Sequence, residues 1–263
     1  MGFVSTVSVI IPTWNRSAAL KRAVRSALSQ SHPPLEVLVC DDGSTDDTGQ
    51  VLRSIGDSRV VWLPGERGGR PAIPRNRGLS HSRGEWLAFL DDDDVWLPEK
   101  LEMQLLAAQS RSCQAVCSDA WRVTPDAPGK EPLVGGESRV LSFAEMLTAN
   151  RVVCSSMLVR KDVVSAAAGF PEAKDLAAIE DYALWLRVAD LAAIAYLASP
   201  LVDYNDDPKA SIRNNRVTVF EQRQIVMNNF IDWKGANGCR CSLRYWRVKA
   251  RLLLEQLSQR FQS

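Results

Sequence analysis

The first hundred residues repeat one pattern: a short apolar run, a polar cluster and then an amphipathic stretch. The apolar runs cover residues 7–11, 35–40 and 59–63. Each is short and rich in branched residues, which is typical of a buried strand. Between the first two runs, residues 18–29 carry their leucines and valine at helical spacing. Strands that alternate with helices predict a parallel, doubly wound α/β sheet.

A fourth apolar run, residues 86–90, leads directly into the carboxylates of residues 91–94. Pro98 and Glu99 just beyond them suit a first helical turn, so the carboxylates lie between a strand and a helix. Ligands of open α/β sheets bind at such strand ends. A divalent cation shared with substrate phosphates would relieve the repulsion among these carboxylates. The run therefore predicts a Mg²⁺ or Mn²⁺ site, and the alternative is a solvated acidic loop.

The second half of the chain is less regular. Short apolar runs predict three further strands, at residues 114–119, 156–159 and 201–204. Residues 124–138 are rich in proline, glycine and charge, which indicates an irregular excursion. Residues 180–190 have a helical spacing of apolar side chains. Beyond about residue 216 the pattern predicts two helices and no strand.

Composition narrows the function classes. The 263 residues, 46% of them hydrophobic, suit one large domain with an appendage. A net charge of +1 gives no reason to expect nucleic acid as a partner. The six cysteines are scattered and there are two histidines, so we expect neither a zinc site nor a disulfide framework. With no signal-peptide pattern and no apolar run of about 18 residues, we expect a cytoplasmic protein.

Four segments carry further chemistry. They are VSVIIPTWNR at residues 7–16, DDGSTD at 41–46, GEWLAFLDDDD at 84–94 and EDYALWLR at 180–187. In this order they closely resemble the inverting family-two nucleotide-sugar glycosyltransferases, over about residues 6–205.

The resemblance implies the GT-A fold, a Rossmann-like, mostly parallel sheet with helices on both faces. It implies a catalytic domain over residues 1–215, whose nucleotide-binding half ends near residue 120 and whose acceptor half covers 121–215. Residues 216–263 would form a C-terminal helical extension.

The resemblance also implies roles for donor-binding residues. The base and ribose pocket would be lined by Pro12, Thr13 and Asn15. Asp42 would accept a hydrogen bond from the ring N–H of the base, which favours uracil because neutral cytosine lacks that donor. The alternative for Asp42 is a turn with Gly43. Arg70 would approach the base or the diphosphate, and Arg75 and Asn76 are rival candidates.

Further roles fall on the acidic segments. By the resemblance, Asp91 and Asp93 form the Asp-x-Asp pair, Asp93 is the metal ligand with Asp91 beside it, and Asp92 faces the ribose or the sugar. Asp181 would be the catalytic base that removes the proton of the acceptor hydroxyl. The alternative is an acid stabilised by the dipole of its helix, which is the main interpretation of Glu180.

The expected reaction is transfer of a hexosyl or N-acetylhexosaminyl group from a nucleotide sugar, most simply a UDP-sugar, with inversion. The acceptor would be a sugar or a lipid-linked molecule in cell-surface polysaccharide or glycolipid synthesis. A Gln-x-x-Arg-Trp motif is absent, which argues against a processive synthase. Many relatives have a histidine where this chain has residues 206–209. The alternatives are a haloacid-dehalogenase-type phosphohydrolase and a non-catalytic module that binds sugar nucleotides.

The last predicted helix carries an apolar face with arginines beside it. The face consists of Leu243, Trp246, Ala250, Leu253, Leu257 and Phe261. The arginines are Arg240, Arg244, Arg247 and Arg251. Such a helix can lie on an anionic membrane surface. The alternative is that the face packs on the catalytic domain or on a second subunit in a homodimer.

Overall fold

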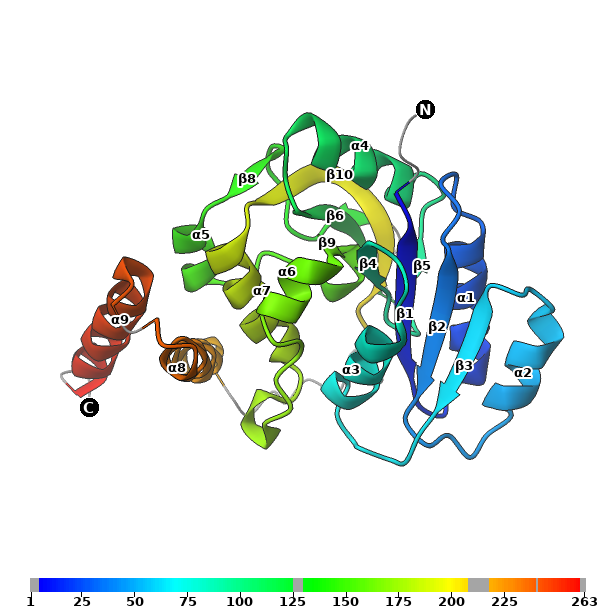
Figure 1. Ribbon diagram of the computed structural model, residues 1–263, viewed down its shortest axis with the longest axis horizontal. Helices are drawn as coiled ribbons and strands as arrows, with labels where there is room; N and C mark the ends of the chain where they lie inside the picture. Colours follow the sequence, from blue (N-terminus) through cyan, green and yellow to red (C-terminus); the bar gives the residue numbers. More distant parts are fainter. Residues whose placement is uncertain (1–4, 125–129, 208–217, 240, 261–263) are drawn as a thin grey trace.

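The computed structural model describes residues 5–124, 130–207, 218–239 and 241–260, with side chains in the last helix up to residue 255. The described strands form one ten-stranded sheet with helices on both faces, and the two C-terminal helices lie at one side of it (Figure 1). The α/β fold class with a C-terminal helical extension is therefore confirmed.

The N-terminal half has the predicted alternation of strands and helices. Its elements are β1 (Val7–Thr13), α1 (Ser17–Leu28), β2 (Glu36–Asp41), α2 (Thr48–Ile55), β3 (Val60–Pro64), α3 (Ala72–His81) and β4 (Trp86–Phe89). The strands are parallel in the order β3-β2-β1-β4. Ile10 pairs with Leu38 on one side and Phe89 on the other. The carboxyl ends of β1, β2 and β4 therefore meet at one edge.

Side chains of β1 alternate between two hydrophobic cores, as the pleat of a strand requires. Val9 and Ile11 pack with α1, α2 and α4 (Lys100–Ser110) on one face. Ile10 packs on the other face with α3, α6 (Lys161–Ala166) and α7 (Glu180–Leu191). Because β1 is buried on both faces, its apolar run is continuous rather than alternating.

The second half of the sheet is mixed rather than parallel throughout. Its remaining elements are β5 (Val95–Trp96), β6 (Ala115–Val123), β7 (Glu131–Pro132), β8 (Arg139–Leu141), α5 (Phe143–Thr148), β9 (Leu158–Arg160) and β10 (Ile194–Asn205). β6 and β10 are parallel to each other, whereas β9 is antiparallel to both β4 and β6. The expected last strand over 201–204 is too short, because β10 begins at Ile194 and continues through two register shifts.

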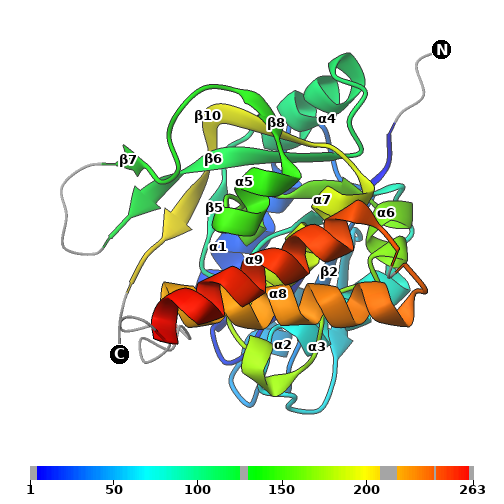
Figure 2. The same ribbon diagram turned by 90° about the vertical axis from the view of Figure 1, so that its left-hand side faces the viewer.

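The C-terminal extension consists of α8 (Val219–Ala236) and α9 (Leu243–Arg260), as predicted. α8 begins with a capping box between Thr218 and Glu221 and buries Val226, Met227 and Phe230. α9 lies along α8 (Figure 2) and buries Tyr245, Val248 and Leu252.

The apolar face predicted for α9 is exposed where its side chains are described. Leu243 is 85% exposed and Trp246 is 54% exposed. The alternative that this face packs on the catalytic domain is therefore wrong for the members whose side chains are described. Arg240, Phe261 and the side chain of Leu257 lie outside the described part of the chain. None of the helices in the described part of the chain combines the length and the apolar composition that crossing a bilayer requires.

Candidate active site

The acidic loop of residues 91–94 follows β4 directly and lies beside the end of β1. Thr13 Oγ1 donates a hydrogen bond to Asp92 Oδ2 at 2.8 Å. Arg16 Nη1 lies 3.2 Å from Asp92 Oδ1 and 2.7 Å from Asp93 Oδ2. Burial and the negative charge of Asp91 raise the pKa of Asp93. The loop therefore holds closely spaced carboxylates whose charge Arg16 partly offsets.

Asp94 fixes this loop to neighbouring parts of the structure through hydrogen bonds. Its side chain is buried, accepts a hydrogen bond from Ser155 Oγ, and accepts another from the backbone N–H of Asn205 at 2.8 Å. Ser155 Oγ in turn accepts from the backbone N–H of Asp91 at 3.0 Å. The contacts tie the loop to the end of β10, so the loop's geometry depends on a strand more than 100 residues away.

Arg75 joins the acidic loop to the first turn of α7. Its side chain is 5% exposed; Nη2 lies 2.6 Å from Asp91 Oδ1 and Nη1 lies 2.6 Å from Glu180 Oε1. Glu180 is equally buried. A buried charge needs such a partner, because losing water around it costs several kcal/mol. Arg75 thus positions two carboxylates that belong to opposite halves of the domain.

Asp181 follows Glu180 and sits at the amino end of α7. The backbone N–H of Tyr182 donates to Asp181 Oδ1 at 2.7 Å, and Asn150 Nδ2 donates to Oδ2 at 3.3 Å. Burial and the adjacent negative charge of Glu180 raise the pKa of Asp181 to about 7, against the opposing effect of Arg75. A carboxyl with that pKa can both accept and release a proton near neutral pH.

Asp42, at the end of β2, is enclosed by the glycine-rich loop of residues 65–70. Its carboxylate pairs with Arg67 and accepts hydrogen bonds from the backbone N–H groups of Gly68 at 2.8 Å and Gly69 at 2.9 Å. The guanidinium of Arg67 also stacks 3.7 Å from the ring centroid of Trp14. The alternative of a turn between Asp42 and Gly43 does not describe these contacts. Asp42, Arg67 and Trp14 therefore form one cluster of contacts at the ends of β1 and β2.

Asn15 and Asp41 organise the turn after β2. Asn15 has a φ of 51°, and its Oδ1 accepts from the backbone N–H of Thr45 at 2.7 Å. Asp41 Oδ1 accepts from the backbone N–H of Ser44 at 2.8 Å. Asp41 therefore has a structural role in this turn, and Asn15 links the loop after β1 to the loop after β2. Pro12 is buried in β1 next to Thr13.

Arg70 and Asn76 point to a different part of the molecule. Arg70 Nη1 donates to the backbone oxygen of Glu172 at 2.7 Å. The Asn76 amide donates to Phe170 O at 2.8 Å and accepts from Phe170 N at 2.9 Å. Both side chains hold the segment around residue 170 against α3 and are not brought together with the acidic loop.

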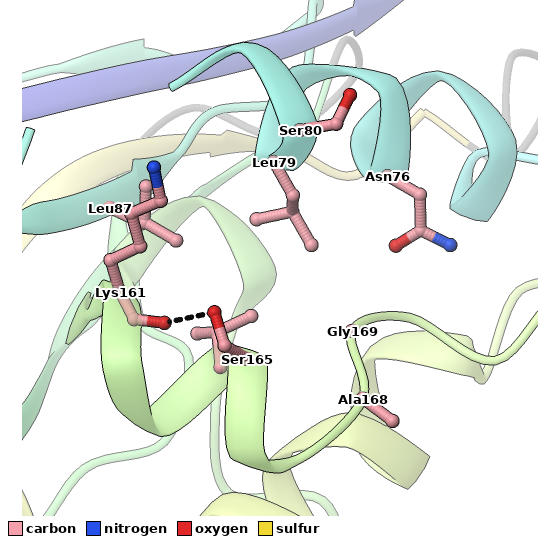
Figure 3. Close-up of a pocket in the computed structure, with 9 residues that line it drawn as sticks. Asn76, Leu79, Ser80, Leu87, Lys161, Ser165, Ala168 and Gly169 are labelled. Carbon is pink, nitrogen blue, oxygen red and sulfur yellow. Dashed lines mark hydrogen bonds between the residues drawn. The ribbon is translucent and has the colours of Figure 1, made fainter. Parts of the chain in front are cut away.

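A hollow of about 280 Å³ lies between α3 and α6, and Asn76 is one of the residues that line it (Figure 3). Leu79, Leu87 and Val164 form its apolar part, and Lys161 borders it. Its lining contains no carboxylate. The hollow is therefore separate from the acidic site.

The carboxylates suit a cation that is shared with a substrate. Among the described residues, no group of three or more histidine, cysteine, aspartate or glutamate side chains is arranged around a common point. Asp91 is 31% exposed and Asp93 is 23% exposed at the side chain, so both reach solvent. Mg²⁺ and similar ions commonly take one or two carboxylates and complete their shell with water and substrate phosphates. The donor set fits that kind of site.

Reasoning from sequence missed the roles of Arg16 and Asp94 and left Arg75 as a rival donor contact. A usable signal existed, since four adjacent carboxylates require nearby cations or hydrogen-bond donors when they are buried. Arg16 follows β1, and Arg75 lies in the first turn of α3, the helix before β4. The order of elements along the chain therefore puts both residues near the same sheet edge. Their individual partners could not be assigned from that placement.

Comparison with known proteins gives consistent results. The profile of Glycosyl transferase family 2 matches residues 8–164. The chain is 30% identical over 185 residues to the UDP-Glc:alpha-D-GlcNAc-diphosphoundecaprenol beta-1,3-glucosyltransferase WfaP of Escherichia coli, covering 69% of each protein. It is 30% identical over 164 residues to the succinoglycan biosynthesis protein ExoO of Rhizobium meliloti, covering 60% of this chain and 45% of that one.

A solved structure shares the fold. The crystal structure of residues 1–349 of S. aureus TarS in complex with UDP superposes with a TM-score of 0.68 at 20% identity, covering 87% of this chain and 65% of that one. The present chain thus spans just under two thirds of that structure. The match over residues 8–164 and the likeness to WfaP show that the chain belongs to glycosyl transferase family 2.

Proposed function

We propose that this protein transfers a sugar from a UDP-sugar to the hydroxyl group of a lipid-linked acceptor, with inversion at the anomeric carbon. The observation that carries the proposal is the pair of contacts made by Arg75. They hold the acidic loop and the α7 turn of Asp181 at one site. A donor whose diphosphate is bound at the loop would then lie close to an acceptor bound at Asp181, with Arg75 between the two binding positions.

In the proposed reaction, Asp181 accepts the proton of the acceptor hydroxyl. The acceptor oxygen forms a bond to the anomeric carbon while the bond from that carbon to the diphosphate breaks, and UDP leaves. One displacement of this kind inverts the configuration. General-base assistance typically contributes about 10²–10⁴ in rate. The raised pKa of Asp181 suits this role better than an ordinary, weakly basic aspartate would.

The donor side would be held by residues at the ends of β1, β2 and β4. Asp93, with Asp91, would hold Mn²⁺ or Mg²⁺, which supplies positive charge to the leaving diphosphate. Asp42 would accept from the uracil ring, while Pro12, Thr13 and Asn15 border the base and ribose. Because Arg67 pairs with Asp42, binding of uracil requires Arg67 to move toward the diphosphate or solvent.

Asp92 is engaged by Thr13 and Arg16, which supports a role in orienting the loop near the ribose or sugar. Arg70 and Asn76 keep their proposed donor roles only if the segment around residue 170 moves on binding. Their present contacts favour a role in packing α3 against that segment.

The acceptor proposal is supported by the likeness to WfaP, which is named for a diphosphoundecaprenol-linked sugar as its acceptor. UDP as the nucleotide is supported by that same name, and the shared fold with TarS extends to structures solved with UDP and UDP-GlcNAc. The haloacid-dehalogenase alternative is overturned by membership of the family. The non-catalytic module remains the competing proposal.

The test is a release assay with a panel of UDP-sugars, Mn²⁺ and short-chain polyprenyl-diphosphate sugars. A transferase releases UDP only with the correct acceptor, and the new linkage has the opposite anomeric configuration by NMR. A binding module would show donor affinity in calorimetry without any release. Retained configuration in the product would contradict the single displacement.

A further inference from the structure

The outward face of α9 is an unusual surface for a helix that packs on a domain. Its exposed apolar residues are Leu243, Trp246, Leu253 and Leu254, from 53% to 85% exposed. The opposite face, with Val248 and Leu252, is buried against the rest of the chain. α9 is therefore apolar on two faces, and its packing on α8 accounts for only one of them.

Basic side chains border the outward face. At 100° per residue, Arg247 and Arg251 lie on one edge and Lys249 lies on the other. Arg251 is paired with Glu255, whereas no described residue forms an ion pair with Arg247. Glu255 is 13% exposed and is also paired with Arg223, so it presents little negative charge outward. The outward face thus combines apolar bulk with a basic rim.

A hollow of about 360 Å³ adjoins this face between α5 and α9. Ala144, Leu147, Ala250 and Leu254 form its apolar part. Arg247 and Arg251 also line the hollow, where their guanidinium groups could bind an anionic group. Guanidinium groups bind phosphate with paired hydrogen bonds, and apolar walls suit the first part of an acyl chain.

We infer that the outward face of α9 binds the surface of an anionic membrane, with a lipid phosphate at Arg247 and Arg251. An amphipathic helix with aromatic and leucine side chains on one face and basic residues beside them lies in the lipid interface in this way. A second copy of the chain is disfavoured as the occupant. Symmetric contact would bring the basic rims together with no exposed acidic residue of α9 to offset them.

The membrane-binding face of α9 is connected through a series of contacts to Asp181. Arg223 Nη2 lies 3.0 Å from Glu255 Oε1, and Arg223 Nη1 donates to the backbone oxygen of Thr148 at 3.2 Å. Asn150, two residues further, donates to Asp181. A bilayer on α9 would therefore lie on the side of the domain that holds Asp181, which would bring a lipid-linked acceptor to it. This use rests on the proposed function, whereas the membrane contact does not.

The test is flotation of the full chain with vesicles of phosphatidylcholine containing about one third phosphatidylglycerol, beside vesicles of phosphatidylcholine alone. We expect strong binding to the anionic vesicles, and weak binding at about 0.5 M salt, where the screening length falls to about 4 Å. Replacing Leu243 and Leu254 together by serine should lower the partition coefficient at least about tenfold. Arg247→Gln should lower it about fivefold.

Matched controls are Leu106→Ser on α4 and Arg53→Gln on α2, which change exposed side chains of the same types elsewhere. Both should float like the unmodified chain. Failure of the unmodified chain to bind anionic vesicles, or unchanged binding of the double serine variant, would overturn the inference. A dimer in sedimentation that the double serine variant dissociates would also overturn it, in favour of a contact between copies.

UDP affinity measured by calorimetry without lipid separates this inference from the proposed function. Lost vesicle binding with intact UDP affinity contradicts the membrane surface alone. Intact vesicle binding without UDP affinity contradicts the proposed function alone. All of these substitutions are at exposed positions and create no cavity, so the unfolding temperatures of the variants should match that of the unmodified chain.

Discussion

Arg75 Nη1 and Glu180 Oε1 lie 2.6 Å apart, although the two residues are 105 positions apart in the chain. Both side chains are 5% exposed. The other end of the guanidinium reaches Asp91. This buried link is the point at which the acidic loop and the helix of Asp181 are held in one arrangement.

Removal of the Arg75 side chain should be costly. Arg75→Ala leaves Glu180 buried without its cation, and breaking a buried pair in this way costs about 3–5 kcal/mol of unfolding free energy. Urea denaturation measures the loss. Adding Glu180→Gln to Arg75→Ala should recover part of it, because the unpaired charge is then gone. If the double variant is no more stable than Arg75→Ala, the lost unfolding free energy does not come from the unpaired carboxylate of Glu180.

Asp93 should be required for metal-dependent donor binding but not for folding. Its side chain is partly exposed at the loop surface, so Asp93→Ala removes no core contact. We expect calorimetry with UDP to show affinity that no longer responds to Mn²⁺, at a nearly unchanged unfolding temperature. Asp47→Ala, at an exposed position before α2, is the control and should bind normally. Mn²⁺-dependent UDP affinity that survives Asp93→Ala would exclude Asp93 as a ligand.

Asp181→Asn tests the base. The substitution keeps the shape of the side chain and removes its ability to accept a proton. We expect sugar transfer to fall by roughly a hundredfold or more, the usual scale for loss of a general base, with donor affinity nearly unchanged. Asp175→Asn, an exposed position before α7, should transfer normally. If transfer falls by only a few fold, Asp181 is not the catalytic base.

The pKa of Asp181 predicts opposite effects of pH on activity and stability. Transfer should rise as pH increases through about 7, because the deprotonated form is the base. The folded pKa lies above the ordinary aspartate value of 3.8, so the folded state binds the extra proton between about pH 4 and 7. The free energy of unfolding should therefore fall as pH rises across that range.

Asp181→Asn should remove this part of the pH dependence. Because Asp181 is only partly buried, we expect the variant to be more stable than the unmodified chain at pH 8 by about 1 kcal/mol rather than by the full value of the shift. Urea denaturation at pH 5 and pH 8 makes the comparison. Parallel pH profiles for the two proteins would show that another group titrates in this range.

Much of this molecule follows from local sequence. The runs that end in Asp42 and in Asp91–Asp94 place carboxylates at strand ends, because a strand buried on both faces needs a continuous apolar run and the chain becomes polar where it leaves the core. The order of these runs predicted the doubly wound half of the sheet. Asp181 was placed at the start of a helix by the spacing of the apolar residues after it.

The tertiary structure decided the partners and the exposed surfaces. Arg75 could have met any carboxylate near the sheet edge, and only the tertiary fold brings Glu180, 105 positions away in the chain, to it. Val248 and Leu252 on one side of α9, and Leu243 and Leu254 on the other, give two apolar stripes at the same helical period. Periodicity identifies apolar positions but not what covers them, since burial depends on which surface the rest of the chain presents to the helix.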